Sequence, residues 1–186
     1  PTRRSSDLTT PVVRCLKLQT GAEVHYLSKQ EFKNVLAPNP YIDKLHLIKD
    51  SVDEVLEKLK AENFDEVIDL HNNLRTLRIK WALGKKTTSF AKHNVAKWVL
   101  VNAKLNLLPK VHIVERYMQT VAHLGVKNDQ KGLDYFLTAD DELDLKTALP
   151  EGFATGYTAF VIGGQHEGKM CSKRKIAEIC KKIKGP

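Results

Sequence analysis

Short strand-like and helix-like patterns alternate through the first half of the chain. Alternating or apolar runs over 23–27, 44–48, 64–70 and 87–91 predict strands, and helical patterns lie between them. Strands and helices at this spacing favour parallel strands joined by right-handed crossovers, with helices on both faces of the sheet. We therefore expect an α/β domain built on a doubly wound parallel sheet.

The helices between these strands carry local start and stop signals. A helix over 11–19 has Pro11 in its first turn and ends at Gly21. Ser51 and Glu54 form a capping box, because each side chain can bind the other residue's free backbone amide at a helix start. Further helices are predicted over 30–36, 72–83, 94–105 and 113–124.

The second half of the chain has a polar stretch followed by another strand and helix. Residues 127–156 include several glycines and suit a connection between domains. A strand is predicted over 157–162 and a helix over 171–184. One such unit cannot bury its own apolar face, so we expect a second domain that is cut off at Pro186.

The formal net charge of +8 is concentrated near the two ends of the chain. From Gly168 onward seven Lys or Arg accompany one acid, and the body of the chain is nearly neutral, so no general nucleic-acid surface is expected. No apolar run reaches the roughly 18 residues of a membrane span. Cys15, Cys171 and Cys180 are odd in number and lack metal-type spacing, which favours a reducing cytoplasm.

Polar residues follow the third predicted strand, where a helix begins. Ligands of open α/β sheets bind beyond the carboxyl ends of the strands, so the stretch from Asp69 to Arg75 is a candidate site. An anion at this helix start would meet free amides, with Arg75 about one turn into the helix. The alternative is that Asn72 caps the helix and Arg75 is a solvated charge.

A second candidate site is the glycine-rich turn after residues 157–162. Gly163 and Gly164 would let the backbone approach a phosphate, and Lys169 would supply the counter-charge. The spacing is not that of a Walker motif, and a plain loop is the alternative. His166 is expected to be a loop histidine rather than a ligand or base.

A third polar cluster opens the helix predicted over 113–124. The spacing of His112, Glu115 and Arg116 allows an internal hydrogen-bond network, including an i,i+4 contact between His112 and Arg116. We expect a structural role, because Tyr117 follows in a core position. Trp81 and Trp98 are also expected to pack between helices, and the strand residues His25 and His46 to be structural.

Five stretches resemble one family when they are taken in order and at their separations: LTTPVVRCLK, FDEVIDLHNNLRT, LLPKVHIVERY, KGLDYF and FVIGGQHEGK. The chain from about Thr9 to its last residue resembles bacterial heptosyltransferases of glycosyltransferase family nine. The resemblance implies the GT-B arrangement, in which an acceptor-side Rossmann-like domain faces one that binds an ADP-sugar. It implies transfer of heptose from ADP-heptose to the lipopolysaccharide inner core, with inversion and without a metal or other cofactor.

The resemblance also implies boundaries and roles. Residues 9–126 would form the acceptor-side domain, 127–156 the connection and 157–186 the start of the donor domain. The enzyme would be cytoplasmic and could contact the inner membrane peripherally. Arg75 stands where some relatives carry Lys, and Asn72-Asn73 departs from their Gln-Gly-Leu pattern, which leaves the acceptor sugar open. The implied acceptor residues are Thr10, His71, Asn72 and Arg75, and the implied diphosphate residues are Gly163, Gly164 and Lys169.

The first eight residues, PTRRSSDL, imitate a family feature. Relatives begin with a hydrophobic strand and a Ser-Ser-x-Gly-Asp turn, whose aspartate is the proposed base toward the acceptor hydroxyl. Asp7 lacks that strand and glycine, so it can only mimic the base. The same eight residues match the translation of a common sequencing-adapter oligonucleotide. We therefore expect Thr9 to be the first native residue and the chain to be an inactive fragment.

A function of another class is compatible with the same architecture. The fold could serve as a non-catalytic nucleotide- or sugar-binding module, or as an interaction domain whose basic tail docks on an anionic membrane. A hydrophobic strand followed by Ser-x-Gly-Asp upstream of Thr9 in the parent gene would favour the enzyme.

Overall fold

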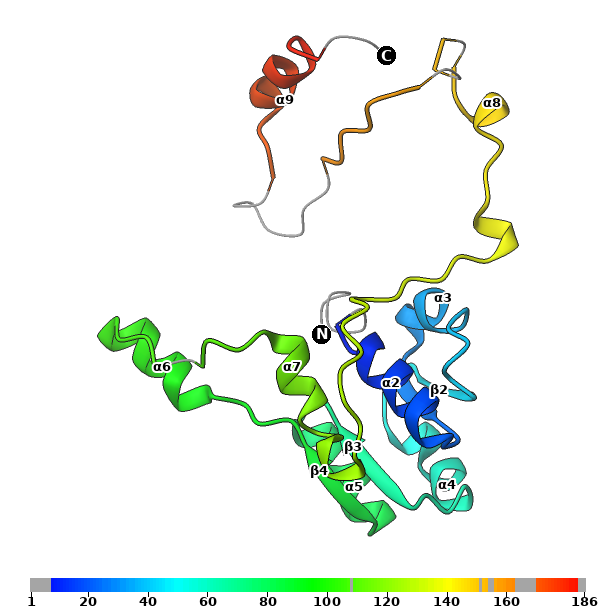
Figure 1. Ribbon diagram of the computed structural model, residues 1–186, viewed down its shortest axis with the longest axis vertical. Coiled ribbons are helices and arrows are strands. Elements are labelled where there is room, and N and C mark those ends of the chain that lie inside the picture. Colours follow the sequence, from blue (N-terminus) through cyan, green and yellow to red (C-terminus); the bar gives the residue numbers. More distant parts are fainter. Residues whose placement is uncertain (1–7, 108, 151, 154–155, 163–169, 184–186) are drawn as a thin grey trace. The chain divides into compact units, whose positions relative to one another are not determined.

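The computed structural model describes residues 8–107, 109–150, 152–153, 156–162 and 170–183. The chain divides into two compact units, Pro1–Phe136 and Leu137–Pro186 (Figure 1). Asp7, Gly163, Gly164, His166 and Lys169 lie outside the described residues.

The first unit alternates helices and strands, as the sequence predicts. Its strands are β1 (His25–Lys29), β2 (Lys44–Ile48), β3 (Glu66–Asp69) and β4 (Lys86–Ser89). Its helices are α2 (Thr10–Thr20), η1 (Gln30–Phe32), α3 (Lys33–Leu36), α4 (Asp53–Ala61), α5 (Leu74–Leu83), α6 (Asn94–Ala103), α7 (Ile113–Met118) and η2 (Ala122–Leu124).

The strands pair in parallel, which confirms the α/β class. Leu27 of β1 lies opposite His46 of β2, and Ile68 of β3 lies opposite Thr88 of β4. Within the described part of the chain the strands form two separate two-stranded sheets, β1-β2 and β3-β4, rather than one continuous sheet. The doubly wound arrangement therefore stays a prediction.

A cavity of about 990 Å³ separates the inner strands of the two sheets. Every residue of β1 and of β3 lines it. Successive side chains of a strand point to opposite faces, so a strand whose residues all line one space turns its edge toward that space. The two sheets do not join, and the cavity lies between the edges of β1 and β3.

The buried core is correspondingly divided into two clusters. One packs α2 against α7, the other packs α4 against α5, and partly buried Leu27 and Ile68 extend them toward the strands. The first consists of Val12, Cys15, Phe90, Val114, Tyr117, Met118, Val121 and Val126, and the second of Val52, Val55, Leu59 and Ile79.

Local signals set the helix ends. Pro11 lies in the first turn of α2, and Gly21 ends that helix in the left-handed region at φ 68°, donating its N–H to the Lys17 carbonyl. The capping box at Ser51 is only half formed. Glu54 Oε1 accepts from the Ser51 amide at 2.7 Å, but Ser51 Oγ accepts from Asp53 rather than from Glu54.

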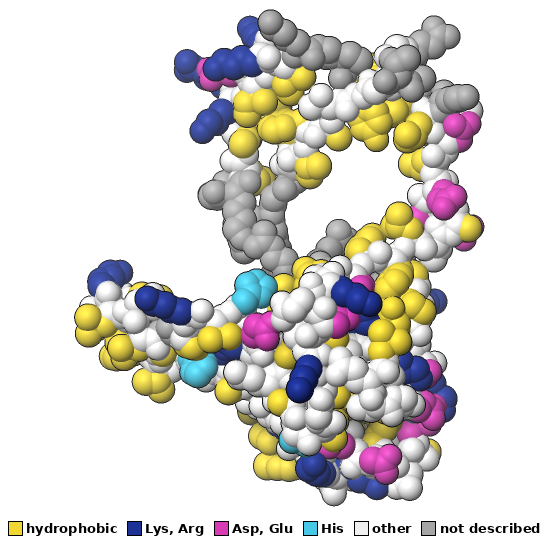
Figure 2. All heavy atoms as spheres, in the orientation of Figure 1, with side chains coloured by type: hydrophobic (Ala, Val, Ile, Leu, Met, Phe, Trp, Pro, Cys, Tyr) yellow, Lys and Arg dark blue, Asp and Glu magenta, His cyan; other side chains and the backbone are white. Residues whose placement is uncertain are grey.

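Some predicted elements are shorter in the structure. The helix predicted over 113–124 breaks into α7 and η2, because the chain turns at Gln119–Val121 instead of continuing the helical ladder. Trp81 and Trp98 do not pack between helices, since their exposed fractions are 78% and 65%. Figure 2 shows hydrophobic side chains exposed over α6, which carries Trp98 together with exposed Val95 and Val101.

The second unit holds η3 (Ala139–Asp141), α8 (Leu145–Ala148) and α9 (Lys173–Cys180). The strand predicted over 157–162 is wrong: these residues form no ladder, because a strand needs a hydrogen-bonding neighbour and the described part of this unit contains no other strand. Val161 is 87% exposed, which agrees with the expected poor burial of this unit.

Among the described residues, no helix is both long enough and apolar enough to cross a membrane.

Candidate functional site

The turn after β3 is built around a buried carboxylate. Asp69 is 4% exposed, and its Oδ1 accepts from the amides of His71 at 3.0 Å and Asn72 at 2.7 Å. Lys80 Nζ lies 2.9 Å from Asp69 Oδ2. Burial by itself would raise the pKa of Asp69, but the hydrogen bonds from Asn72 and Lys80 outweigh it and lower that pKa. Asp69 is therefore an ionised structural anchor for the turn.

Asn72 joins the turn to the chain after β4 and does not cap α5. Its φ of 46° lies in the left-handed region, which Asn tolerates better than most residues, and its Nδ2 donates to the Phe90 carbonyl at 3.1 Å. The helix cap is Asn73, whose Oδ1 accepts from the amides of Arg75 and Thr76. The sequence alternative that made Asn72 the cap is therefore wrong by one residue.

Arg75 lies in the first turn of α5 and lines the cavity. The residue is exposed, and within the described part of the chain its guanidinium makes no hydrogen bond or ion pair. His71 also lines the cavity, and burial lowers its pKa, so its imidazole is mainly neutral near neutral pH. The structure thus places a cation and a neutral imidazole of the same turn, Arg75 and His71, among the residues that line the cavity.

Two further cations that line the cavity come from the chain after β4. Lys92 and Arg116 both line the cavity. Arg116 is engaged in the fold, because its Nη2 donates to the Ala91 carbonyl at 2.7 Å and its guanidinium lies 4.8 Å from the centre of the Phe90 ring. Lys92 was missed by the sequence analysis. The signal was available, since Lys92 follows the fourth predicted strand just as His71 follows the third.

The remaining predicted acceptor residues lie elsewhere. Thr10 is buried in α2, and its Oγ1 accepts from the Asp134 amide at 2.9 Å. Thr10 and Asn72 are not among the residues that line the cavity, whereas His71 and Arg75 are. A role of any of these four residues in acceptor binding stays a prediction.

The third polar cluster is structural, as expected. His112 Nδ1 accepts from the Val114 amide at the start of α7, and Glu115 accepts from Asn128 and Gln130. Tyr117 is buried, with its ring centre 4.6 Å from that of Phe90. The contact predicted between the His112 and Arg116 side chains is replaced by these separate partners.

The fold is similar to that of a solved structure. It is described as "The crystal structure of the glycosyl transferase family 9 from Veillonella parvula DSM 2008", and it matches with a TM-score of 0.60 at 22% sequence identity. In fold, the chain resembles a family 9 glycosyltransferase. The match covers 75% of this chain and 43% of that protein, so the chain spans less than half of its length.

No protein-family model matches the chain, and a search of the curated proteins found no significant match. The likeness to the family 9 structure therefore concerns the fold. It agrees with the α/β class, while the facing two-domain arrangement stays a prediction.

Proposed function

We propose that this chain is the acceptor-side part of a glycosyltransferase of family 9, and that its parent transfers heptose from ADP-heptose to the lipopolysaccharide inner core with inversion. The fold shared with a family 9 protein and the five resembling stretches support this proposal. The observation that carries it is the guanidinium of Arg75, which is unpaired among the described residues and lies at the cavity beyond the carboxyl end of β3.

The cavity wall suits an acidic sugar acceptor. Arg75 and Lys92 supply positive charge, and a guanidinium can hold a carboxylate or phosphate with two parallel hydrogen bonds. Neutral His71 can accept a hydrogen bond from a sugar hydroxyl. This combination orients an acceptor by its acidic groups while leaving a hydroxyl to react.

The donor would bind on the second domain. By the resemblance, Gly163 and Gly164 would let the backbone approach the diphosphate of ADP-heptose, and Lys169 would offset its charge. In an inverting transfer the acceptor oxygen attacks the anomeric carbon from the face opposite the diphosphate, and the bond between that carbon and the diphosphate oxygen breaks. ADP leaves with the electron pair, so a cation such as Lys169 would stabilise the developing charge.

The acceptor hydroxyl must lose its proton during this attack. The family base is an aspartate after a hydrophobic first strand, and Asp7 only mimics it. The match covers 43% of the family 9 structure. We propose that this chain is inactive alone, that the transfer needs no metal, and that the full-length protein is cytoplasmic and contacts the inner membrane peripherally at most.

The test uses the full-length reading frame of the parent gene. The purified protein is mixed with ADP-heptose and heptose-deficient lipopolysaccharide, and ADP release and the mass of the glycolipid are measured. We expect one added heptose per acceptor in the presence of a chelator, and no transfer by the present chain. Binding of both substrates without transfer would support the non-catalytic module instead, and transfer of a hexose would correct the donor.

A further inference from the structure

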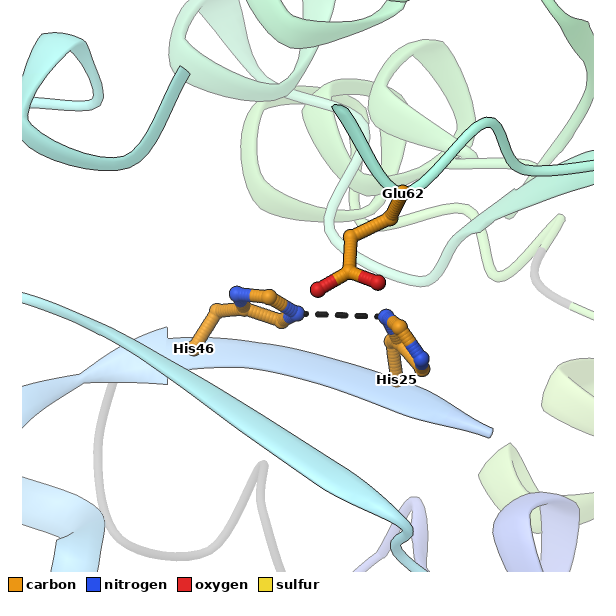
Figure 3. A group of neighbouring side chains, drawn as sticks. All are labelled: His25, His46 and Glu62. Carbon is orange, nitrogen blue, oxygen red and sulfur yellow. Dashed lines mark hydrogen bonds between the residues drawn. The ribbon is translucent and has the colours of Figure 1, made fainter. Parts of the chain in front are cut away.

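Two histidines and a glutamate converge beside the first sheet (Figure 3). His25 is the first residue of β1, His46 lies in β2, and Glu62 follows α4. The rings lie in hydrogen-bond contact, with His46 Nε2 3.2 Å from His25 Nδ1. One potential ligand atom from each residue lies within 4.8 Å of the other two, and all three residues are half-buried. The proposed transfer reaction uses none of these groups.

We propose that His25, His46 and Glu62 form a zinc-binding site. Two imidazole nitrogens and one carboxylate oxygen are a common protein ligand set for Zn²⁺, with water as the fourth ligand. Tetrahedral bonds of about 2.0–2.1 Å place ligand atoms roughly 3.3–3.4 Å apart. The two histidine nitrogens, at 3.2 Å, already have this spacing. The Glu62 carboxylate supplies the third ligand oxygen, within 4.8 Å of the two histidine ligand atoms, and it points toward them (Figure 3).

The orientation of His25 is fixed by groups around it. Its Nε2 lies 2.9 Å from Glu23 Oε1, and its ring packs edge-on against Phe64 with ring centres 5.0 Å apart. A carboxylate on the outer nitrogen holds the proton there and turns the lone pair of the other nitrogen toward the metal. Glu23 thereby prepares Nδ1 of His25 as a ligand.

The metal would replace a hydrogen bond. Because Glu23 keeps the proton of His25 on Nε2, the contact without metal is a hydrogen bond from Nε2–H of His46 to the Nδ1 lone pair of His25. With Zn²⁺ bound, both nitrogens face the cation, and the His46 proton moves to its own Nδ1. Both rings stay neutral, and no other group has to gain or lose a proton.

Lys44 competes with the cation for the same carboxylates. Its Nζ lies 2.8 Å from Glu62 Oε2 and 3.7 Å from Glu23 Oε1. Lys44 is half exposed, so its ammonium can swing into solvent when a dication takes over the charge balance. Removing the Lys44 charge should therefore strengthen zinc binding. If the cluster were held only by ion pairs, the same change would weaken it.

The test uses the full chain with Cys171→Ser and Cys180→Ser, because these exposed thiols could bind zinc themselves. After treatment with a chelator, Zn²⁺ alone is titrated by calorimetry against the protein, and Co²⁺ absorption reports the coordination geometry. We expect one equivalent bound. His46→Gln and Glu62→Gln should each weaken affinity about tenfold or more, as should Glu23→Gln through the outer nitrogen of His25.

Two controls complete the experiment. Lys44→Met should tighten zinc binding, and His93→Gln, outside the cluster, should leave it unchanged. Far-ultraviolet circular dichroism checks the fold of each variant, and Glu62 is a safe position because it lies at a helix end and is partly exposed. The proposal would be overturned if zinc binding were not saturable. It would also be overturned if His46→Gln and Glu62→Gln bound zinc as tightly as the chain that carries only the two Cys→Ser changes.

Discussion

Arg14 and Asp129 form a two-pronged ion pair between the first helix and the chain that follows η2. Nε of Arg14 donates to Oδ2 at 2.9 Å, and Nη2 donates to Oδ1 at 2.7 Å. Nη2 also donates to the Gly132 carbonyl, and Asp134 is a second ion-pair partner. The Arg14 side chain is 3% exposed. This cluster joins two of the family-like stretches, LTTPVVRCLK and KGLDYF, through a buried guanidinium.

Removing the Asp129 charge should destabilise the first unit strongly. Asp129→Ala leaves the Arg14 guanidinium buried with one partner fewer, and breaking such a pair typically costs about 3–5 kcal/mol. Urea unfolding measures the loss. The matched control is Glu57→Gln, whose partner Lys60 is 44% exposed, and we expect a loss of about 1 kcal/mol or less there. Similar small losses at both positions would contradict the structural role of the pair.

The same pair predicts a loss of stability in acid. Hydrogen bonding to Arg14 holds the pKa of Asp129 well below its usual range, even though burial opposes this shift. Because the folded-state pKa is the lower one, the stabilisation is present above the unfolded value of about 3.9 and is lost as the pH falls toward the folded value. The unfolding free energy should fall steadily below about pH 4. Asp129→Asn should flatten this dependence, and an unchanged slope would count against Asp129 as its source.

Arg75→Ala should weaken acceptor use in the full-length parent. Loss of a charge-assisted hydrogen bond costs about 1.5–3 kcal/mol, which corresponds to a rise of roughly tenfold or more in the acceptor KM. Arg78→Ala is the matched control, because Arg78 lies one turn further along α5, pairs with exposed Asp53 and does not line the cavity. Acceptor kinetics that are equal in both variants would remove Arg75 from the site.

Hydrogen exchange should distinguish the two units. Val67 and Ile68 lie in β3, which pairs with β4, whereas Val161 is in no strand and Ile179 lies on the short helix α9. Local opening costs little where few apolar contacts and ladder bonds exist. We expect the amides of Val161 and Ile179 to exchange faster than those of Val67 and Ile68. Equal protection would show that the second unit is stabilised by contacts outside its own short elements.

A hydrophobic strand added upstream of Thr9 should stabilise the first unit. The edges of β1 and β3 face the cavity, so an inserted strand would gain ladder bonds on both sides and bury apolar area at about 25 cal/mol per Å². A higher urea midpoint and slower exchange at Leu27 and Ile68 are the expected results. A Gly/Ser extension of equal length is the control. An equal midpoint for both extensions would show that the cavity does not accept a strand.

Local chemistry made much of the first unit predictable. The strand over 44–48 has the predicted bounds, and α2 and α5 end at Gly21 and Gly84 because glycine adopts the left-handed conformation at low cost. The polar turn from Asp69 to Arg75 was recognisable from the rule that parallel sheets bind ligands at the carboxyl ends of their strands. These features depend on neighbours within a few positions.

Features that depend on distant partners were not predictable in the same way. The sequence by itself determined the alternation of strands and helices, their main boundaries and the position of the Arg75 turn. Only the tertiary structure decided that the sheet is split by a cavity, that Arg14 is buried against Asp129, and that His25 and His46 meet beside Glu62. The physical reason is that periodicity and capping act between near neighbours, whereas strand pairing and buried charges depend on segments that only folding brings together.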